Sequence, residues 1–296
     1  MGSGSWSESN YCSYSTSVGR SFDASSRTIS TTYASASQAY TQSTLSKDLD
    51  PKGVIRECCE TAEHPNTLPV ILALDVTGSM GKTAIQVQKQ LNPIMVDLYK
   101  NVKDVEIAVM GIGDLAYDNM PIQFSQFESD IRIAENLDKI CFEGGGGGNS
   151  YESYTAAWYM GARRSRLDCW KRGKKGVIIT MGDECLNPYL PKSDLANNTG
   201  DSANLQDDVD TEDLYEEASK KYEIYHICVK SKSYPNQDEQ AESFKKVLGN
   251  QHVFICGPDE IHQVIMDIVK RSAENGQFIE SPAVAPSPIG SGEISW

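Results

Sequence analysis

The chain has 296 residues, which is enough for one large α/β domain with a sizeable core and terminal segments. Its formal net charge of −14 repels nucleic acids and anionic membranes, so we expect neither as a partner. No apolar stretch approaches the roughly 18 residues that span a bilayer, and no apolar leader opens the chain, so the expected location is the cytoplasm.

The eight cysteines lack the paired spacing of a zinc site. Cys58 and Cys59 are adjacent, and Cys228 and Cys256 fall inside expected buried strands, which favours reduced thiols. None of the four histidines is near another in the sequence. A histidine-based metal or catalytic cluster is therefore not expected.

Residues 1–50 form an N-terminal arm rich in Ser, Thr and Tyr. Its low apolar content predicts disorder in isolation, because little surface can be buried to offset the entropy of ordering. Aromatic residues spaced along it leave a second interpretation open, an arm that orders on a partner. These residues are Trp6, Tyr11, Tyr14, Phe22, Tyr33 and Tyr40. Residues 276–296, with isolated prolines and glycines, are expected to form a C-terminal tail.

Strands and helices alternate over residues 51–275. Continuous apolar runs such as Leu68–Leu74 are typical of strands buried on both faces of a parallel sheet. The pattern predicts an α/β fold, a doubly wound and mainly parallel sheet flanked by helices, of the Rossmann-like kind. A polar stretch at 186–210 is expected to be a surface insertion. The expected strands are Leu68–Asp75, Val105–Gly111, Ile122–Phe127, Gly176–Thr180, Ile224–Val229 and Val253–Cys256, and the expected helices are Lys82–Asn101, Ile131–Ile140, Tyr151–Arg163, Glu212–Lys221, Gln240–Leu248 and Ile261–Arg271.

The turn after the first of these strands reads Asp75-Val-Thr77-Gly-Ser79. Alternate residues of a tight turn can point the same way, so one carboxylate and two hydroxyls could converge on a hard cation such as Mg²⁺. The alternative is a helix N-cap, since Asp, Thr and Ser all cap helices well. Three such residues in alternation favour the metal. Asp183 ends another expected strand, and ligands bind beyond the carboxyl ends of parallel strands.

The Asp75-x-Thr77-x-Ser79 turn resembles the D-x-S-x-S signature of von Willebrand factor A (VWA) domains, with Thr in place of the first Ser. The segment from Thr180 to Asp183 resembles that family's late T-D-G loop, although two residues separate the Thr from the Asp. The resemblance covers about residues 51–275. It implies a metal-ion-dependent adhesion site (MIDAS), with Mg²⁺ or Mn²⁺ held by the turn and by Asp183, directly or through water.

The family's further threonine, from a loop between the two motifs, is missing here. Five glycines at 144–148 are followed by Asn149, Ser150, Tyr151 and Glu152. We predict Asn149 and Glu152 as the substitutes, with Ser150 left open. The glycines indicate either a flexible hinge or a close approach of backbone to the ion or to a partner.

Two catalytic alternatives use the same segment. Residues 76–83 nearly match the phosphate loop G-x-x-x-x-G-K-[ST], but Val76 stands where the first glycine is required. A Mg²⁺-dependent nucleotide hydrolase is therefore the alternative function. A phosphatase with Asp75 as nucleophile would need a second Asp where Thr77 stands, because Thr cannot act as the general acid.

We expect a non-catalytic protein that binds a protein partner through its metal ion. The ion would bridge the turn at Asp75 to a carboxylate on that partner. The resemblance further implies an intracellular adaptor or assembly factor, in some relatives one that serves AAA+ ATPases.

Overall fold

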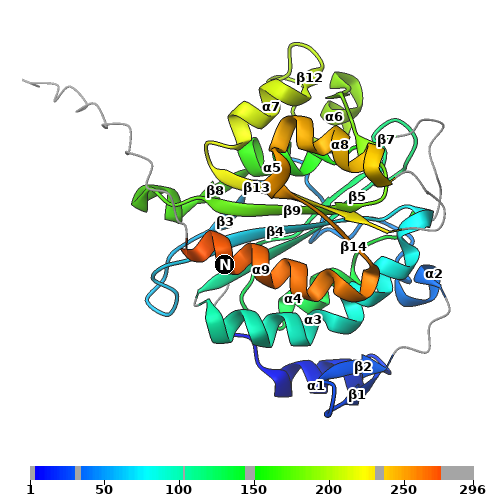
Figure 1. Cartoon of the computed structure of the whole chain (residues 1–296), viewed down its shortest axis with the longest axis vertical. Helices are drawn as coiled ribbons and strands as arrows, with labels where there is room; N and C mark the ends of the chain where they lie inside the picture. The colour runs from blue at the N-terminus through cyan, green and yellow to red at the C-terminus, as the bar shows by residue number, and fades with distance from the viewer. Residues whose placement is uncertain (1–3, 31–34, 103, 144–150, 231–236, 275–296) are drawn as a thin grey trace, which may run out of the picture.

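A six-stranded sheet forms the centre of the computed structural model, which describes residues 4–30, 35–102, 104–143, 151–230 and 237–274 (Figure 1). The strand order is β14-β13-β9-β4-β5-β6, and every neighbouring pair is parallel except β5 with β6. The strands are β4 (Leu68–Asp75), β5 (Val105–Ile112), β6 (Ile122–Phe124), β9 (Gly176–Gly182), β13 (Tyr222–Val229) and β14 (Val253–Cys256). The predicted α/β class with a mainly parallel sheet is confirmed.

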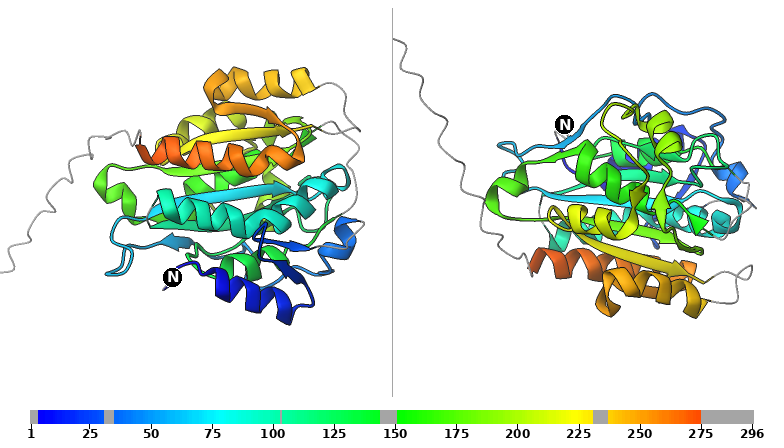
Figure 2. Two further views of the ribbon diagram at one scale, coloured as in Figure 1. Left: turned by 60° about the horizontal axis from the view of Figure 1, so that its bottom comes forward. Right: turned by 90° about the horizontal axis from the view of Figure 1, so that it is seen from above.

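Helices cover both faces of this sheet, because its central strands are apolar on both sides (Figure 1, Figure 2). On one face α3, α4 and α9 pack into one hydrophobic core, and on the other α5, α7 and α8 pack into a second. The helices are α3 (Gly81–Asn101), α4 (Arg132–Asp138), α5 (Thr155–Arg164), α7 (Thr211–Ala218), α8 (Gln237–Leu248) and α9 (Ile261–Glu274).

The order of the strands places the ends of β4 and β9 side by side. After β4 the sheet grows through β5 and β6 in one direction, whereas β9, β13 and β14 lie on the other side of β4. The register pairs Leu74 with Met181, so the carboxyl ends of β4 and β9 are adjacent. Ligands of open α/β sheets bind beyond such ends, where the strand order reverses. Asp75 and Asp183 both lie at this point.

The described part of the N-terminal arm is folded against α3, which differs from the expectation of disorder. It lies along the outer side of α3, where Tyr11, Ile29 and Tyr40 are buried (Figure 2). Its elements are α1 (Glu8–Ser17), β1 (Ser21–Asp23), β2 (Thr28–Ser30) and α2 (Ala36–Ala39). The arm thus orders on the chain's own α3, because a few large side chains supply the apolar surface that its average composition lacks.

The polar stretch at 186–210 is part of a core as well as of the surface. Leu190 and Leu195 are fully buried in the hydrophobic cluster that contains α5. Arg164 of α5 forms an ion pair of 2.8 Å with Asp201, and both side chains are mostly buried. The stretch contains β11 (Tyr189–Leu190), α6 (Lys192–Thr199) and β12 (Val209–Asp210).

Two short parallel pairs flank the main sheet, β3 with β8 and β7 with β10. They comprise β3 (Arg56–Cys58), β8 (Ser165–Leu167), β7 (Tyr151–Glu152) and β10 (Cys185–Leu186). Because β7 pairs with β10, the helix expected from Tyr151 begins only at Thr155. The tail at 276–296 and the glycines at 144–148 lie outside the described residues. Within the described ranges, no helix combines the length and the apolar character needed to cross a membrane.

Candidate metal centre

Asp75, the last residue of β4, is fully buried and its carboxylate accepts three hydrogen bonds. Its Oδ1 accepts the Thr77 backbone N–H at 2.9 Å and the Thr77 Oγ1 hydroxyl at 2.6 Å. Its Oδ2 accepts the Tyr154 hydroxyl at 2.8 Å. The N-cap positions of the short helix Gly78–Met80 and of α3 are Thr77 and Met80, and neither makes a side-chain capping bond. Asp75 is therefore not an N-cap.

Ser79 and Asp183 meet across the ends of β4 and β9. The Ser79 hydroxyl donates to Asp183 Oδ1 at 2.7 Å, although the two residues are 104 positions apart. Asp183 is 1 % exposed, and its backbone carbonyl accepts a hydrogen bond from the side chain of Gln240 in α8. The structure thus brings the early turn and the late loop together.

Each of the two hydroxyls of the turn is hydrogen-bonded to one carboxylate. Thr77 gives its proton to Asp75, and Ser79 gives its proton to Asp183. A hydroxyl that donates its one proton keeps its lone pairs for an acceptor role. Each oxygen can therefore serve as a neutral ligand whose negative charge is supplied by the carboxylate behind it.

Burial makes this site electrostatically unfavourable for negative charge. It raises the pKa of the Asp75 carboxyl above its ordinary value; the Thr77 and Tyr154 hydrogen bonds oppose the rise, and Asp183 adds to it. Burial also raises the pKa of Glu152, and the charge of Asp75 adds most among its acidic neighbours. Among the described residues, no lysine, arginine or histidine forms an ion pair with Asp75 or Glu152. A buried carboxylate without a counter-charge is costly, so the site favours a cation or a proton.

The donor set fits a hard divalent cation. Glu152 is 4 % exposed, and its Oε2 has no hydrogen-bond partner among the described residues. Carboxylate and hydroxyl oxygens are the ligands that Mg²⁺ and Mn²⁺ prefer. In the described ranges, no three His, Cys, Asp or Glu side chains are arranged to hold a metal. A cation at this site would therefore depend on the hydroxyls of Thr77 and Ser79.

The predicted ligands are placed as follows. Asp75, Thr77, Ser79 and Asp183 lie together, and Glu152 lies close enough for the charge of Asp75 to raise its pKa. Asn149 and Ser150 lie outside the described residues.

Asp114 and Asp118 belong to the turn that follows β5. Asp118 Oδ2 accepts the Asp114 backbone N–H at 2.7 Å, and Asp114 Oδ1 accepts that of Ala116 at 2.8 Å. Both carboxylates contribute to the raised pKa of Glu152, so they also add to the negative charge around the site.

Tyr154 is the site residue that the sequence does not reveal. It precedes α5 and is fully buried, which is typical of an ordinary core aromatic. Its contact with Asp75 depends on how β4, β9 and α5 are packed, and no local spacing encodes that arrangement.

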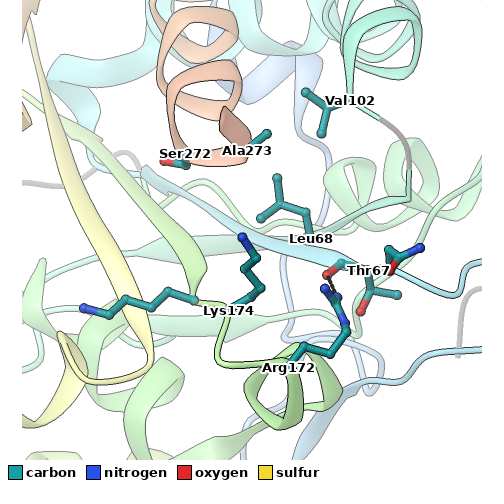
Figure 3. Close-up of a pocket in the computed structure, with 9 residues that line it drawn as sticks. Thr67, Leu68, Val102, Arg172, Lys174, Ser272 and Ala273 are labelled. Carbon is teal, nitrogen blue, oxygen red and sulfur yellow. Dashed lines mark hydrogen bonds between the residues drawn. The ribbon is translucent and has the colours of Figure 1, made fainter. Parts of the chain in front are cut away.

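A cavity of about 190 Å³ lies at the opposite end of β4 and is separate from this site (Figure 3). Its lining includes Leu68, the first residue of β4, together with Lys174 and Arg172. Arg172 is already bound to the Glu60 carboxylate and to the Thr67 carbonyl. Arg172 thus serves the local structure at the amino end of the sheet.

No protein-family model matches the chain, and no curated protein matches it in sequence. Among solved structures, the pilus adhesin SpaC from Lactobacillus rhamnosus GG is similar with 11% identity and a TM-score of 0.50, over 76% of this chain and 32% of the adhesin. The vWF domain of the type V pili tip protein Mfa5 from Porphyromonas gingivalis is a weaker likeness, with 13% identity and a TM-score of 0.45, over 72% of this chain and 97% of that domain. This chain spans about a third of the length of SpaC. At this identity, the likeness shows that the chain shares an α/β fold with part of that adhesin.

Proposed function

We propose that this chain is a VWA-like, doubly wound protein that binds a protein partner through a divalent cation and has no catalytic turnover of its own. Mg²⁺ or Mn²⁺ would be held by Asp75, Thr77, Ser79 and Asp183, with Glu152 beside them. The observation that carries this proposal is the hydrogen bond of 2.7 Å between Ser79 and Asp183, which joins the two predicted motifs at one point.

The chemistry of binding follows from the donor set. When bound, the cation would supply positive charge to a pocket that otherwise holds several buried carboxylates. Octahedral cations that meet few protein ligands retain open positions for water. A carboxylate from a partner can take such a position, and the charge attraction is strong because Asp75 and Asp183 are shielded from solvent.

The nucleotide hydrolase alternative is not favoured by the backbone of the same segment. A phosphate loop points its amide N–H groups at the phosphates. Here the Val76 N–H donates to the Ile112 carbonyl at 2.9 Å, and the Thr77 N–H donates to Asp75. Both amides are already used within the chain.

The proposed partner is a protein that presents an acidic residue to the cation. AAA+ ATPases are among the proposed partners. The proposed location is a reducing compartment such as the cytoplasm. All eight cysteines are free, which supports this location.

A Mn²⁺ titration by calorimetry tests the metal site. We expect the wild-type chain to bind one Mn²⁺ and Asp75→Ala to bind none, because that change removes the carboxylate that orients Thr77. Asp207→Ala, which removes the same charge from an exposed position, should bind as the wild type does. Mn²⁺ binding by Asp75→Ala equal to that of the wild type would overturn the site.

Capture from the native host tests the function. A partner recovered with Mg²⁺ should be released by EDTA and should not be recovered by Asp75→Ala. Recovery of the partner by the wild type with Mg²⁺, by the wild type with EDTA and by Asp75→Ala would assign the contact to another surface. ATP binding and phosphate release by the same preparation would support the hydrolase instead.

A further inference from the structure

Tyr154 joins three segments that meet at the candidate metal centre. It precedes α5 and is fully buried. Its hydroxyl donates to Asp75 Oδ2 at 2.8 Å and accepts the Glu184 backbone N–H at 3.2 Å. One phenol oxygen therefore links the start of α5, the end of β4 and the loop after β9.

Gly182 is required for this position of Tyr154. It is the last residue of β9, and a methyl group added to its Cα would overlap the Tyr154 hydroxyl and the ring carbon that bears it. No side chain other than hydrogen fits there without moving the tyrosine. This accounts for a glycine directly before Asp183, where the chain departs from the spacing of the VWA loop.

Packing alone does not explain the hydroxyl. The Tyr154 ring contacts the His226 ring edge-on, with centroids 5.1 Å apart, and the Phe244 ring at 5.5 Å. A phenylalanine would make the same contacts and would not bury a polar oxygen. Burying a hydroxyl is costly unless it is hydrogen-bonded, and here its partners belong to the metal centre.

We propose that Tyr154 is a positioning residue of the metal centre, held by Gly182, which fixes the carboxylate of Asp75 through its Oδ2. This inference rests on the proposed function. Hydrogen bonds from Tyr154 to Oδ2 and from Thr77 to Oδ1 restrain rotation of the carboxylate plane. The Thr77 hydroxyl is then aligned for the cation.

Tyr154→Phe tests this role, because it removes the hydroxyl and keeps the ring. Partners behind a metal ligand typically contribute about 10- to 100-fold to metal affinity, so we expect a Mn²⁺ affinity at least about tenfold weaker. The matched control is Tyr222→Phe. Tyr222 is also buried and its hydroxyl bonds to Ser165 Oγ at 2.5 Å, but it pairs with Gly176 at the far end of β9. This control should bind Mn²⁺ as the wild type does.

Gly182→Ala provides a second variant, which keeps the hydroxyl but removes its space. It should weaken Mn²⁺ binding to a similar extent. Gly176→Ala is its control, since a methyl group there would press on the Tyr222 ring, away from the metal centre. Gly176→Ala should lower stability in urea and leave the Mn²⁺ affinity unchanged.

The outcomes separate this inference from the proposed function. If Tyr154→Phe binds Mn²⁺ as tightly as the wild type does, with or without a loss of stability in urea, Tyr154 is only a packing residue. That result would overturn this inference and leave the proposed metal centre intact. Absence of Mn²⁺ binding in the wild type and in Tyr222→Phe would overturn the proposed function, and this inference with it.

Discussion

Glu106 shows how a single buried acid can set the pH dependence of stability. It lies on β5 with 1 % of its surface exposed, beside the Cys58 thiol, whose hydrogen bond to the carboxylate lowers the pKa by less than burial raises it. Burial raises its pKa to about 7. Glutamate in an unfolded chain titrates near about 4.3, so the unfolded state loses its proton at lower pH than the folded state does. Folding stability therefore falls as pH rises from the unfolded pKa to the folded one.

Glu106→Gln should remove this dependence, because glutamine is neutral throughout. We expect its free energy of unfolding to exceed that of the wild type by an amount that grows by about 2 kcal/mol between pH 5 and pH 8. Urea unfolding at both pH values measures the gap. Glu216→Gln changes an exposed acid on α7 and should show no such growth. A gap that is the same at both pH values would mean that Glu106 does not titrate in this range.

The residues of the metal centre differ in how far the sequence could predict them. Asp75, Thr77 and Ser79 are close in sequence, so their spacing alone predicts a shared turn. Asp183 follows from topology, because parallel strands end at the same edge of a sheet. Tyr154 could not be predicted, since its contact requires the absence of a side chain on β9 and the orientation of α5.

At the scale of elements, the arm and α3 depend on each other. The outer side of α3 carries Gln88 and Asn92, both fully or almost fully buried. The Tyr11 hydroxyl donates to the Gln88 carbonyl at 3.3 Å, and Trp6 Nε1 donates to Asn92 Oδ1 at 2.9 Å. Composition predicted disorder because it averages over the arm, whereas these contacts depend on a few residues at particular positions. The sequence predicted a helix over Lys82–Asn101 but no element that covers its outer side.

Arg20 attaches the arm to α4. Its guanidinium donates two hydrogen bonds of 2.8 Å to the Asp138 carboxylate, and the two side chains are 7% and 16% exposed. Breaking a buried pair leaves a charge without its partner, which typically costs about 3–5 kcal/mol. The Tyr14 hydroxyl and the Gln88 amide also donate to Asp138, so Arg20→Ala should cost about 3 kcal/mol, at the lower end of that range.

A control in the same arm distinguishes this effect from loss of surface charge. Arg27 pairs with Glu8, and these side chains are 31% and 42% exposed. Exposed pairs contribute less than about 1 kcal/mol, so Arg27→Ala should have a small effect on urea unfolding. Equal losses for the two variants would show that the arm is not fixed to the domain through Arg20. A large loss for Arg20→Ala alone would show that the arm belongs to the folded unit.

At the scale of the whole molecule, the net charge of −14 complicates any test of metal dependence. Repulsion among these charges destabilises the folded state, and any added salt screens it. A divalent cation would therefore raise the melting temperature even without a site. Two further comparisons are needed, one at constant ionic strength and one with the site removed.

Mn²⁺ at about 100 times its dissociation constant should stabilise the folded chain by about 2.7 kcal/mol, because it binds the folded state and not the unfolded one. For a chain of this size that corresponds to a rise in melting temperature of about 5 °C. The rise should exceed that produced by NaCl at the same ionic strength, and EDTA should reverse it. Asp75→Ala should retain only the rise that NaCl produces. If Mn²⁺ raises the melting temperature of the wild type no more than NaCl does, the carboxylates at the ends of β4 and β9 bind no cation. Protonation of Glu152 and Asp75 would then be what removes their buried negative charge.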